Sequence, residues 1–254
     1  MSPDLARLGM CSCRCPIRAC FDGTETCSKS RWVLRRRLGS GDCITSNTTE
    51  TYGLRIVISG IVKVFDYTRN GEQFIHKFVY PGEFLKLQPW AEIPKCTTIA
   101  LTDVKICDIA YQWHRQAEAP FPGIDRVLLA SAIWENNHAE LWQRILVLRK
   151  PLDRVIYFLL DIAERSGIYC DRECLIELPM TRSDVADYLG LKRETVSRAF
   201  SQLRDEGYIS VLNRQTHAIR NIRRLANLVD SEIVTSSVNP QQSGRIDAPR
   251  QYDA

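Results

Sequence analysis

The first half of the chain alternates between short runs of β-branched and aromatic residues and brief polar turns. Three such runs lie between Arg31 and Trp113, and they read LRIVISG, IVKVFDY and QFIHKFVYPG. Asn70-Gly71, between the second and third runs, is typical of a tight β-hairpin turn. Further along, TTIALTDVKICDIA predicts two more strands around Thr102-Asp103. Several short strands in about eighty residues predict a small antiparallel barrel or roll.

The pattern then changes to that of a long helix, with positions recurring alternately every three and four residues. These positions are Ile124, Val127, Ser131, Trp134, His138, Leu141, Ile145 and Leu148. Such a heptad stripe is typical of a coiled-coil contact. Because the sequence has no second long heptad helix to pair with, the stripe favours a seam between two copies; a core helix within one copy is the alternative. Pro151 ends this helix and opens the next, whose stripe is Val155, Phe158, Leu159 and Ile162.

The segment LPMTRSDVADYLGLKRETVSRAFSQLRDEGYISV predicts two short amphipathic helices separated by a glycine. Thr181 and Asp184 form a T-x-x-D capping box that opens the first helix, and Gly190 supplies the turn. The second helix begins near Lys192. Its apolar side consists of Val196, Phe200 and Leu203. Two helices joined by a tight glycine turn predict a helix-turn-helix.

Two short strands are predicted directly after the second helix. They are Tyr208–Val211 and Ala218–Ile222, and the polar turn Asn213-Arg214-Gln215 lies between them. This β-hairpin forms a wing beside the helix-turn-helix. A capping box, a glycine turn, two apolar stripes and a wing in this order favour a DNA-binding unit over an amphipathic helix whose charges are only solvated.

The polar side of the second helix has the chemistry of a base-reading surface. Glu194, Ser197, Arg198 and Ser201 lie opposite its apolar side at ~100° per residue. Arg198 can donate two hydrogen bonds to guanine O6 and N7, Glu194 can accept one from cytosine N4, and Ser197 can contact a base edge or a thymine methyl. The residues predicted to contact phosphate or to lie beside such contacts are Thr181, Arg182, Arg193, Ser201, Arg204 and Arg214.

Composition and charge agree with a globular protein that binds nucleic acid locally. Hydrophobic residues make up 44% of the 254 residues and charged residues 25%. The net charge of +4 is too small to identify a partner. The segment from Arg182 to Arg224, however, contains nine Lys and Arg and only five Asp and Glu, which makes it locally basic. No catalytic pair with a base is recognisable, so we expect no enzyme. TSSVNPQQSGRIDAPRQYDA is polar and predicts a disordered tail.

Ten cysteines are present, and five of them lie between Cys11 and Cys27 in CSCRCPIRACFDGTETC. Arg7, Arg14 and Arg18 interrupt the only candidate for a signal peptide. No segment approaches the ~20 apolar residues that span a bilayer. We therefore expect a cytoplasmic protein with no membrane contact, in which clustered thiols more often hold a metal than form disulfides.

The order of roll, long helix and winged helix-turn-helix resembles the CRP/FNR family of bacterial transcription regulators, over about Leu34 to Leu228. The most specific resemblance is MTRSDVADYLGLKRETVSR. Its E-T-V-S-R segment matches the FNR branch, whose Glu, Ser and Arg read a TTGA-type half-site, which implies Glu194, Ser197 and Arg198 as readers. Arg193 resembles the first arginine of the corresponding CRP-branch segment. The resemblance implies a homodimer on an inverted repeat of double-stranded DNA and a contact with RNA polymerase.

The FNR branch also binds a [4Fe–4S] cluster through three N-terminal cysteines and one on a roll strand. The resemblance places Cys107 as the strand ligand. Cys15, Cys20 and Cys27 are the expected N-terminal ligands, with Cys11 and Cys13 as alternatives; their C-x-C-x-C-x4-C-x6-C spacing departs from the family's C-x2-C pattern. The resemblance therefore implies a regulator that responds to oxygen or redox conditions through this cluster. The alternative is a regulator of the same family that has no cluster and responds to thiol redox chemistry, another metal or a small effector.

A cyclic nucleotide is not expected. The family's nucleotide binders use a Gly-Glu pair for the ribose and an Arg-Ser pair for the phosphate. Gly82-Glu83 fits the first pair, but Lys95-Cys96 stands at the second, without the guanidinium and the hydroxyl.

The predicted fold class is α+β, with an N-terminal antiparallel β-roll, a long dimerisation helix and a C-terminal winged helix-turn-helix. The expected segments are a cysteine-rich stretch at 1–30, the roll at 31–122, the dimerisation helix at 123–150, the DNA-binding domain at 151–228 and the tail at 229–254.

Overall fold

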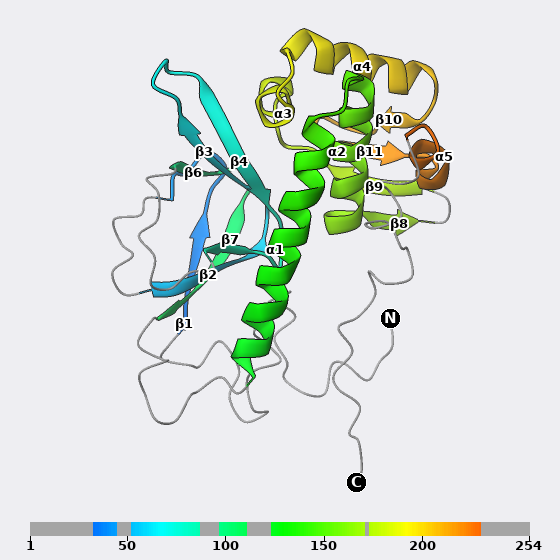
Figure 1. Cartoon of the computed structure of the whole chain (residues 1–254). Coiled ribbons are helices and arrows are strands. Elements are labelled where there is room, and N and C mark those ends of the chain that lie inside the picture. The colour runs from blue at the N-terminus through cyan, green and yellow to red at the C-terminus, as the bar shows by residue number, and fades with distance from the viewer. Residues whose placement is uncertain (1–32, 45–51, 87–96, 111–122, 171–172, 230–254) are drawn as a thin grey trace. The chain divides into compact units, whose positions relative to one another are not determined.

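The computed structural model of the chain describes residues 33–44, 52–86, 97–110, 123–170 and 173–229 (Figure 1). The predicted cysteine-rich segment at 1–30 lies outside these residues, and so does the predicted tail apart from Val229. The chain divides into two compact units, Met1–Asn137 and His138–Ala254, and the division falls within the long helix. None of the described helices is both long and apolar enough to cross a membrane.

The first unit contains the predicted antiparallel roll. Its strands are β1 (Val33–Leu38), β2 (Tyr52–Ser59), β3 (Val62–Tyr67), β4 (Gln73–Val79), β5 (Phe84–Lys86), β6 (Thr97–Ala100) and β7 (Val104–Ala110). They form one sheet in the order β1-β7-β2-β5 and another in the order β4-β3-β6, with antiparallel pairing throughout. The five strands predicted from the hydrophobic runs are confirmed, while β1 and β5 were not predicted.

The turn between β3 and β4 confirms the predicted hairpin. Gly71 has a φ of 79°, a left-handed conformation that glycine adopts without strain. Its amide donates to the carbonyl of Thr68 at 2.9 Å, and the amide of Thr68 donates to the carbonyl of Glu72 at 2.8 Å. The Asn-Gly pair therefore fixes the register of the two strands.

Apolar side chains fill two layers of this unit. The roll interior lies between the sheets and contains Ile44, Val57, Val62, Val64, Val79, Ala100, Val104 and Ile106. A second cluster covers the other face of the β2–β7 pair, where Leu54, Ile56, Phe84, Cys107, Ile109 and Ile124 pack together. Strand alternation explains this division, because neighbouring residues of β7 point to opposite faces.

Unexpected in the roll is a group of charged side chains on the interior side of β7. Asp108 is fully buried and accepts from Nε of Arg36 at 2.7 Å and from Nε of Arg55 at 2.6 Å. This pairing explains why β1 was missed, since a strand with three consecutive arginines carries no apolar alternation. A buried carboxylate needs such partners to offset its desolvation.

The long helix, α1 (Ile124–Leu146), confirms the helix expected from the heptad stripe. Part of its predicted seam, however, packs against other residues of the same chain. Ile124 is 2% exposed in the second roll cluster, and Ile145 is 1% exposed. Burial within the chain already accounts for the apolar character of these two positions. Leu129 and Ile133, four residues apart and outside the predicted seam, are exposed by 63% and 51%.

The second unit has a helix-rich layer and one small sheet. Its elements are α2 (Pro151–Ser166), β8 (Ile168–Cys170), β9 (Glu173–Glu177), α3 (Arg182–Leu189), α4 (Arg193–Asp205), β10 (Ile209–Val211), β11 (Thr216–Ile219) and α5 (Ile222–Ala226). The sheet has the order β10-β11-β9-β8. The predicted wing is confirmed as β10 and β11, although its second strand ends at Ile219 and α5 follows. The β8–β9 hairpin, which pairs with β11, was not predicted.

α2 is the centre of the second unit. All residues from Val155 to Ala163 are buried, so the helix is covered on more than its predicted stripe. Lys150 is its N-cap and Pro151 occupies the first turn, as expected for a residue without an amide hydrogen. α2 packs against α4 and β9, and thereby positions α4.

Candidate nucleic-acid interface

The start of α3 is fixed by the predicted capping box. The Thr181 hydroxyl accepts from the Asp184 amide at 3.0 Å and donates to the Asp184 carboxylate at 2.7 Å. The Thr181 amide donates to the same carboxylate oxygen at 2.9 Å. Two helix-terminal amides that lack intrahelical partners are thereby satisfied. Because Asp184 is 6% exposed, the box also anchors α3 against the interior.

The turn between α3 and α4 depends on Gly190. Its φ of 61° and ψ of 42° are left-handed, and its amide donates to the carbonyl of Ala186. The Leu191 amide donates to the same carbonyl at 2.9 Å. A left-handed residue here ends α3 and turns the chain directly into α4. The predicted helix-turn-helix is therefore confirmed as a local structure.

α4 presents its two sides as the sequence predicts. Val196, Ala199, Phe200 and Leu203 are buried. On the opposite side Glu194 and Arg198 are exposed, and Ser197 and Ser201 are half-buried. The three predicted base-reading residues thus lie on one outward surface of a single rigid helix. Burial of the apolar side fixes the rotation of the helix about its axis and keeps these polar groups outward.

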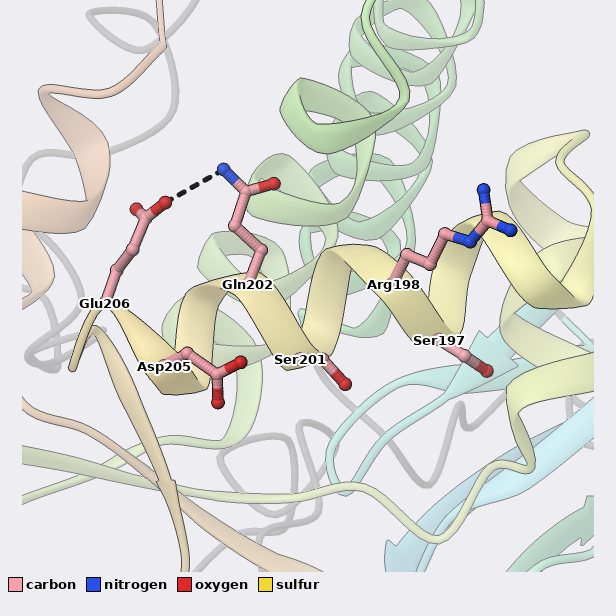
Figure 2. A pocket seen from close by; sticks show the side chains of 6 residues that line it. All are labelled: Ser197, Arg198, Ser201, Gln202, Asp205 and Glu206. Atoms are coloured by element: carbon pink, nitrogen blue, oxygen red, sulfur yellow. Dashed lines mark hydrogen bonds between the residues drawn. The ribbon is translucent and has the colours of Figure 1, made fainter.

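The polar side of α4 continues beyond the predicted readers. An open hollow of about 510 Å³ is lined by Ser197, Arg198, Ser201, Gln202, Asp205 and Glu206. Figure 2 shows these side chains in two rows, with Ser197, Ser201 and Asp205 on one side and Arg198, Gln202 and Glu206 on the other. The Gln202 amide donates to the Glu206 carboxylate at 2.9 Å. Gln202 was missed, although the four-residue spacing from Arg198 would have placed it in the same row.

Arg182, a predicted phosphate contact, is held by an aromatic ring. Its guanidinium carbon lies 3.5 Å from the centroid of Phe200. Partial burial lowers the pKa of Arg182 from its usual value, and the positive charge of Arg204 adds to this effect. Arg182 thus joins the first turn of α3 to the buried side of α4.

The other predicted phosphate contacts are at the surface. Arg193 lies at the start of α4 and Arg214 in the turn of the wing, and both are exposed. Arg204 lies near the end of α4, where its Nη2 donates to the Ser201 hydroxyl at 3.4 Å and its Nε pairs with Asp205 at the same distance. Exposed guanidinium groups at the two ends of α4 and in the turn of the wing offer separate contacts to a phosphate backbone.

His217 lies behind this surface, on β11. It is 5% exposed, and its ring meets Phe200 edge to face with the centroids 6.5 Å apart. Burial lowers the pKa of His217, and the positive charge of Arg182 lowers it further. The neutral imidazole therefore belongs to the packing between the wing and α4.

The predicted cluster ligands are placed only in part. Cys15, Cys20 and Cys27, with the alternatives Cys11 and Cys13, lie outside the described residues. Cys107 lies on β7 and is fully buried within the apolar cluster that includes Ile124. Among the described residues no group of three or more His, Cys, Asp or Glu could hold a metal ion. Of the predicted ligands, Cys107 is the one that lies within the described residues, and it has no exposed surface.

The Gly82-Glu83 pair, which fits the ribose-binding pair of the family's nucleotide binders, is part of a tight turn. Gly82 has a φ of 94°, and the Glu83 carboxylate accepts from the Tyr80 amide at 3.0 Å. Lys95 and Cys96 lie outside the described residues. The expectation that no cyclic nucleotide binds stays a prediction.

Comparisons with known proteins agree with both units. A family model for the cyclic nucleotide-binding domain matches residues 35–117, and one for the Crp-like helix-turn-helix domain matches residues 153–228. The nitrogen fixation regulation protein FixK of Bradyrhizobium diazoefficiens is 30% identical over 186 residues, which are 70% of this chain and 75% of that protein. The transcriptional activator protein Anr of Pseudomonas aeruginosa is 27% identical over 171 residues, covering 67% and 70% of the two chains.

Solved structures show the same architecture. FixK2 from Bradyrhizobium japonicum superposes with a TM-score of 0.65 at 27% identity, covering 78% of this chain and 98% of that one. A CooA mutant from Carboxydothermus hydrogenoformans gives a TM-score of 0.61 at 18% identity, covering 78% and 88%, and supports the fold alone. Relatives of this kind are transcription regulators and not enzymes. The chain belongs to the CRP/FNR family and is a DNA-binding transcription regulator.

Proposed function

We propose that two copies of the chain bind an inverted repeat, with α4 of each copy in the major groove of one half-site. One observation carries this proposal: Glu194 and Arg198 are exposed on α4 while Val196, Phe200 and Leu203 on its other side are buried. A helix held in this way can enter a groove without losing its packing. Two-fold symmetry then puts the half-sites ~34 Å apart, one turn of DNA.

Glu194, Ser197 and Arg198 read the bases of each half-site. A TTGA-type half-site contains one G·C pair, whose guanine offers O6 and N7 and whose cytosine offers N4. Arg198 donates to the guanine, and Glu194, one helical turn earlier, accepts from the cytosine. Ser197 contacts a neighbouring base edge or thymine methyl. Arg182, Arg193, Arg204 and Arg214 bind phosphates and set the register, with Thr181 and Ser201 beside them.

Two copies pair through the exposed apolar surface of α1. Leu129 and Ile133 lie about 40° apart around the helix and are both more than half exposed. Trp134, a member of the predicted seam, is 42% exposed but lies on another side of α1, about 100° from Ile133. Large apolar side chains in an exposed stripe such as Leu129 and Ile133 favour contact with a second helix. The same stripe on a second copy is its natural partner, because a two-fold contact uses the same surface twice.

The proposal is tested by selecting duplexes from a random pool with the purified full-length chain. We expect enrichment of an inverted repeat with two TTGA-type arms at one fixed spacing. Enrichment of a direct repeat or of an isolated half-site would contradict the dimer, and no enrichment at all would contradict sequence-specific reading.

A [4Fe–4S] cluster as the source of the signal is a second proposal, supported by the position of Cys107 on β7, shortly before α1 in the sequence. A ligand of such a cluster binds one iron through its sulfur, and Cys107 as packed is buried among apolar side chains with no exposed surface for that bond, so no part of the DNA reading is assigned to the cluster. Anaerobic purification with iron and sulfide analysis tests this. Iron-loaded protein that loses iron in Cys107→Ala supports it, and iron-free protein that binds its repeat contradicts it.

A further inference from the structure

Arg154, in the first turn of α2, connects two backbone segments that are distant in sequence. Its Nε and Nη2 both donate to the carbonyl of Leu148, at 2.9 Å and 2.7 Å. Its Nη1 donates to the carbonyl of Leu189 at 3.1 Å. Leu148 lies in the corner between α1 and α2, and Leu189 is the last residue of α3. One side chain thus joins this corner to the turn of the helix-turn-helix.

The chemistry of both partners suits a guanidinium. The Leu189 carbonyl is at the C-terminal end of α3, where carbonyls lack intrahelical donors and carry partial negative charge. The Leu148 carbonyl lies in the corner between α1 and α2, outside both helices, where it can accept from a side chain. The planar guanidinium presents its N–H groups in fixed directions, so three hydrogen bonds to two carbonyls fix an angle as well as a distance. A lysine ammonium at the same position is a point donor on a flexible stem and does not reproduce this fork.

An apolar contact joins the same parts of the second unit. Trp142 on α1 is 6% exposed, and its ring centroid lies 4.7 Å from that of Tyr188 on α3. Tyr188 also meets Phe158 of α2, with centroids 6.0 Å apart. Ring contacts of this kind hold helices together but allow small sliding movements. The directional bonds of Arg154 therefore determine the orientation of α3 against the corner.

We propose that Arg154 is a positioning residue, which sets the orientation of the helix-turn-helix relative to the end of α1. This inference rests on the proposed function, because α1 carries the contact between copies and α4 reads the half-site. The orientation fixed by Arg154 determines the distance and angle at which a dimer presents its two α4 helices. Arg154 therefore selects the spacing of the half-sites without touching DNA.

The test compares the full-length wild type with Arg154→Lys, and uses Arg149→Lys as a matched control. Arg149 is an exposed arginine next to the same corner. Dissociation constants are measured on a single half-site and on inverted repeats whose spacer is the selected length or one or two base pairs longer or shorter. Stoichiometric titration of the half-site gives the active fraction, to which all values are normalised.

For Arg154→Lys we expect half-site affinity within about twofold of the wild type. At the selected spacing, affinity should fall by about tenfold, within the range of ordinary coupling between sites. The preference for that spacing should also flatten, while Arg149→Lys retains it.

If Arg154→Lys keeps the wild-type spacing preference, the positioning role is overturned. The same holds if the variant loses affinity by the same factor on the half-site and on the full repeat, or if its only change is a smaller active fraction. A wild type with no preference for an inverted repeat would instead contradict the proposed function.

Discussion

Thr181→Ala removes the N-cap hydroxyl of α3. The Asp184 amide loses its acceptor at 3.0 Å, and the Asp184 carboxylate loses its donor at 2.7 Å. Loss of an N-cap costs about 1 kcal/mol. The lost bond to a buried carboxylate adds to this, but only in part, since Thr181 is exposed and water can replace its hydroxyl. We expect the free energy of unfolding of the second unit to fall by about 1.5 kcal/mol.

The assay is urea unfolding followed by the helical circular dichroism signal. With m-values of about 1–3 kcal/mol per molar urea, the midpoint should fall by roughly 0.5–1.5 M with an unchanged slope. Thr181→Ser is the control, because serine keeps the hydroxyl that accepts from the Asp184 amide. If the alanine and serine variants unfold within about 0.3 kcal/mol of each other, the cap does not stabilise α3 and the reasoning is refuted.

Three further predictions concern pH, assembly and phosphate contacts. Burial and the charge of Arg182 lower the pKa of His217, so the unfolded chain takes up its proton first. The free energy of unfolding should therefore fall as the pH drops below about 6.5. In urea titrations, His217→Phe should lack the part of this decrease that protonation of His217 causes. If the variant and the wild type show the same pH dependence, the prediction is contradicted. In analytical sedimentation, Ile133→Asp should shift the chain from dimer to monomer, whereas Ile133→Leu should leave it a dimer. If Ile133→Asp stays a stable dimer, the exposed face of α1 that includes Ile133 is not the contact between copies. Arg214→Ala should weaken binding equally on all sequences and reduce the slope of log affinity against log salt by about one; a change in base preference would assign Arg214 to the bases.

The helix-turn-helix could be predicted in detail because its signals are local. The Thr181–Asp184 box, the left-handed Gly190 and the apolar stripe of α4 each act within a few residues, and all are found as expected. Local hydrogen bonds and helical periodicity are properties of short sequences. The strands β1 and β9 are different, because pairing with β7 and β11 makes them strands.

The residues of the predicted dimer seam illustrate a different limit. A heptad stripe shows that a face is covered but not what covers it, and Ile124 is covered by its own roll. Arg154 carried no signal either, since its partners are backbone carbonyls that look alike in every sequence. The interior pairing of Arg36 and Arg55 with Asp108 depends on strand register, which the charges alone do not reveal.

Whether α4 reads bases is tested most directly by pairing Arg198→Ala with base substitutions in the selected repeat. The wild type should lose about 1–3 kcal/mol when the guanine of either arm is replaced by another base. Arg198→Ala should bind the original and the substituted duplexes with nearly equal affinity while keeping its preferences at the other positions. If the variant is instead weakened to the same extent on every duplex and still prefers the guanine, Arg198 does not read that base pair and the account is contradicted.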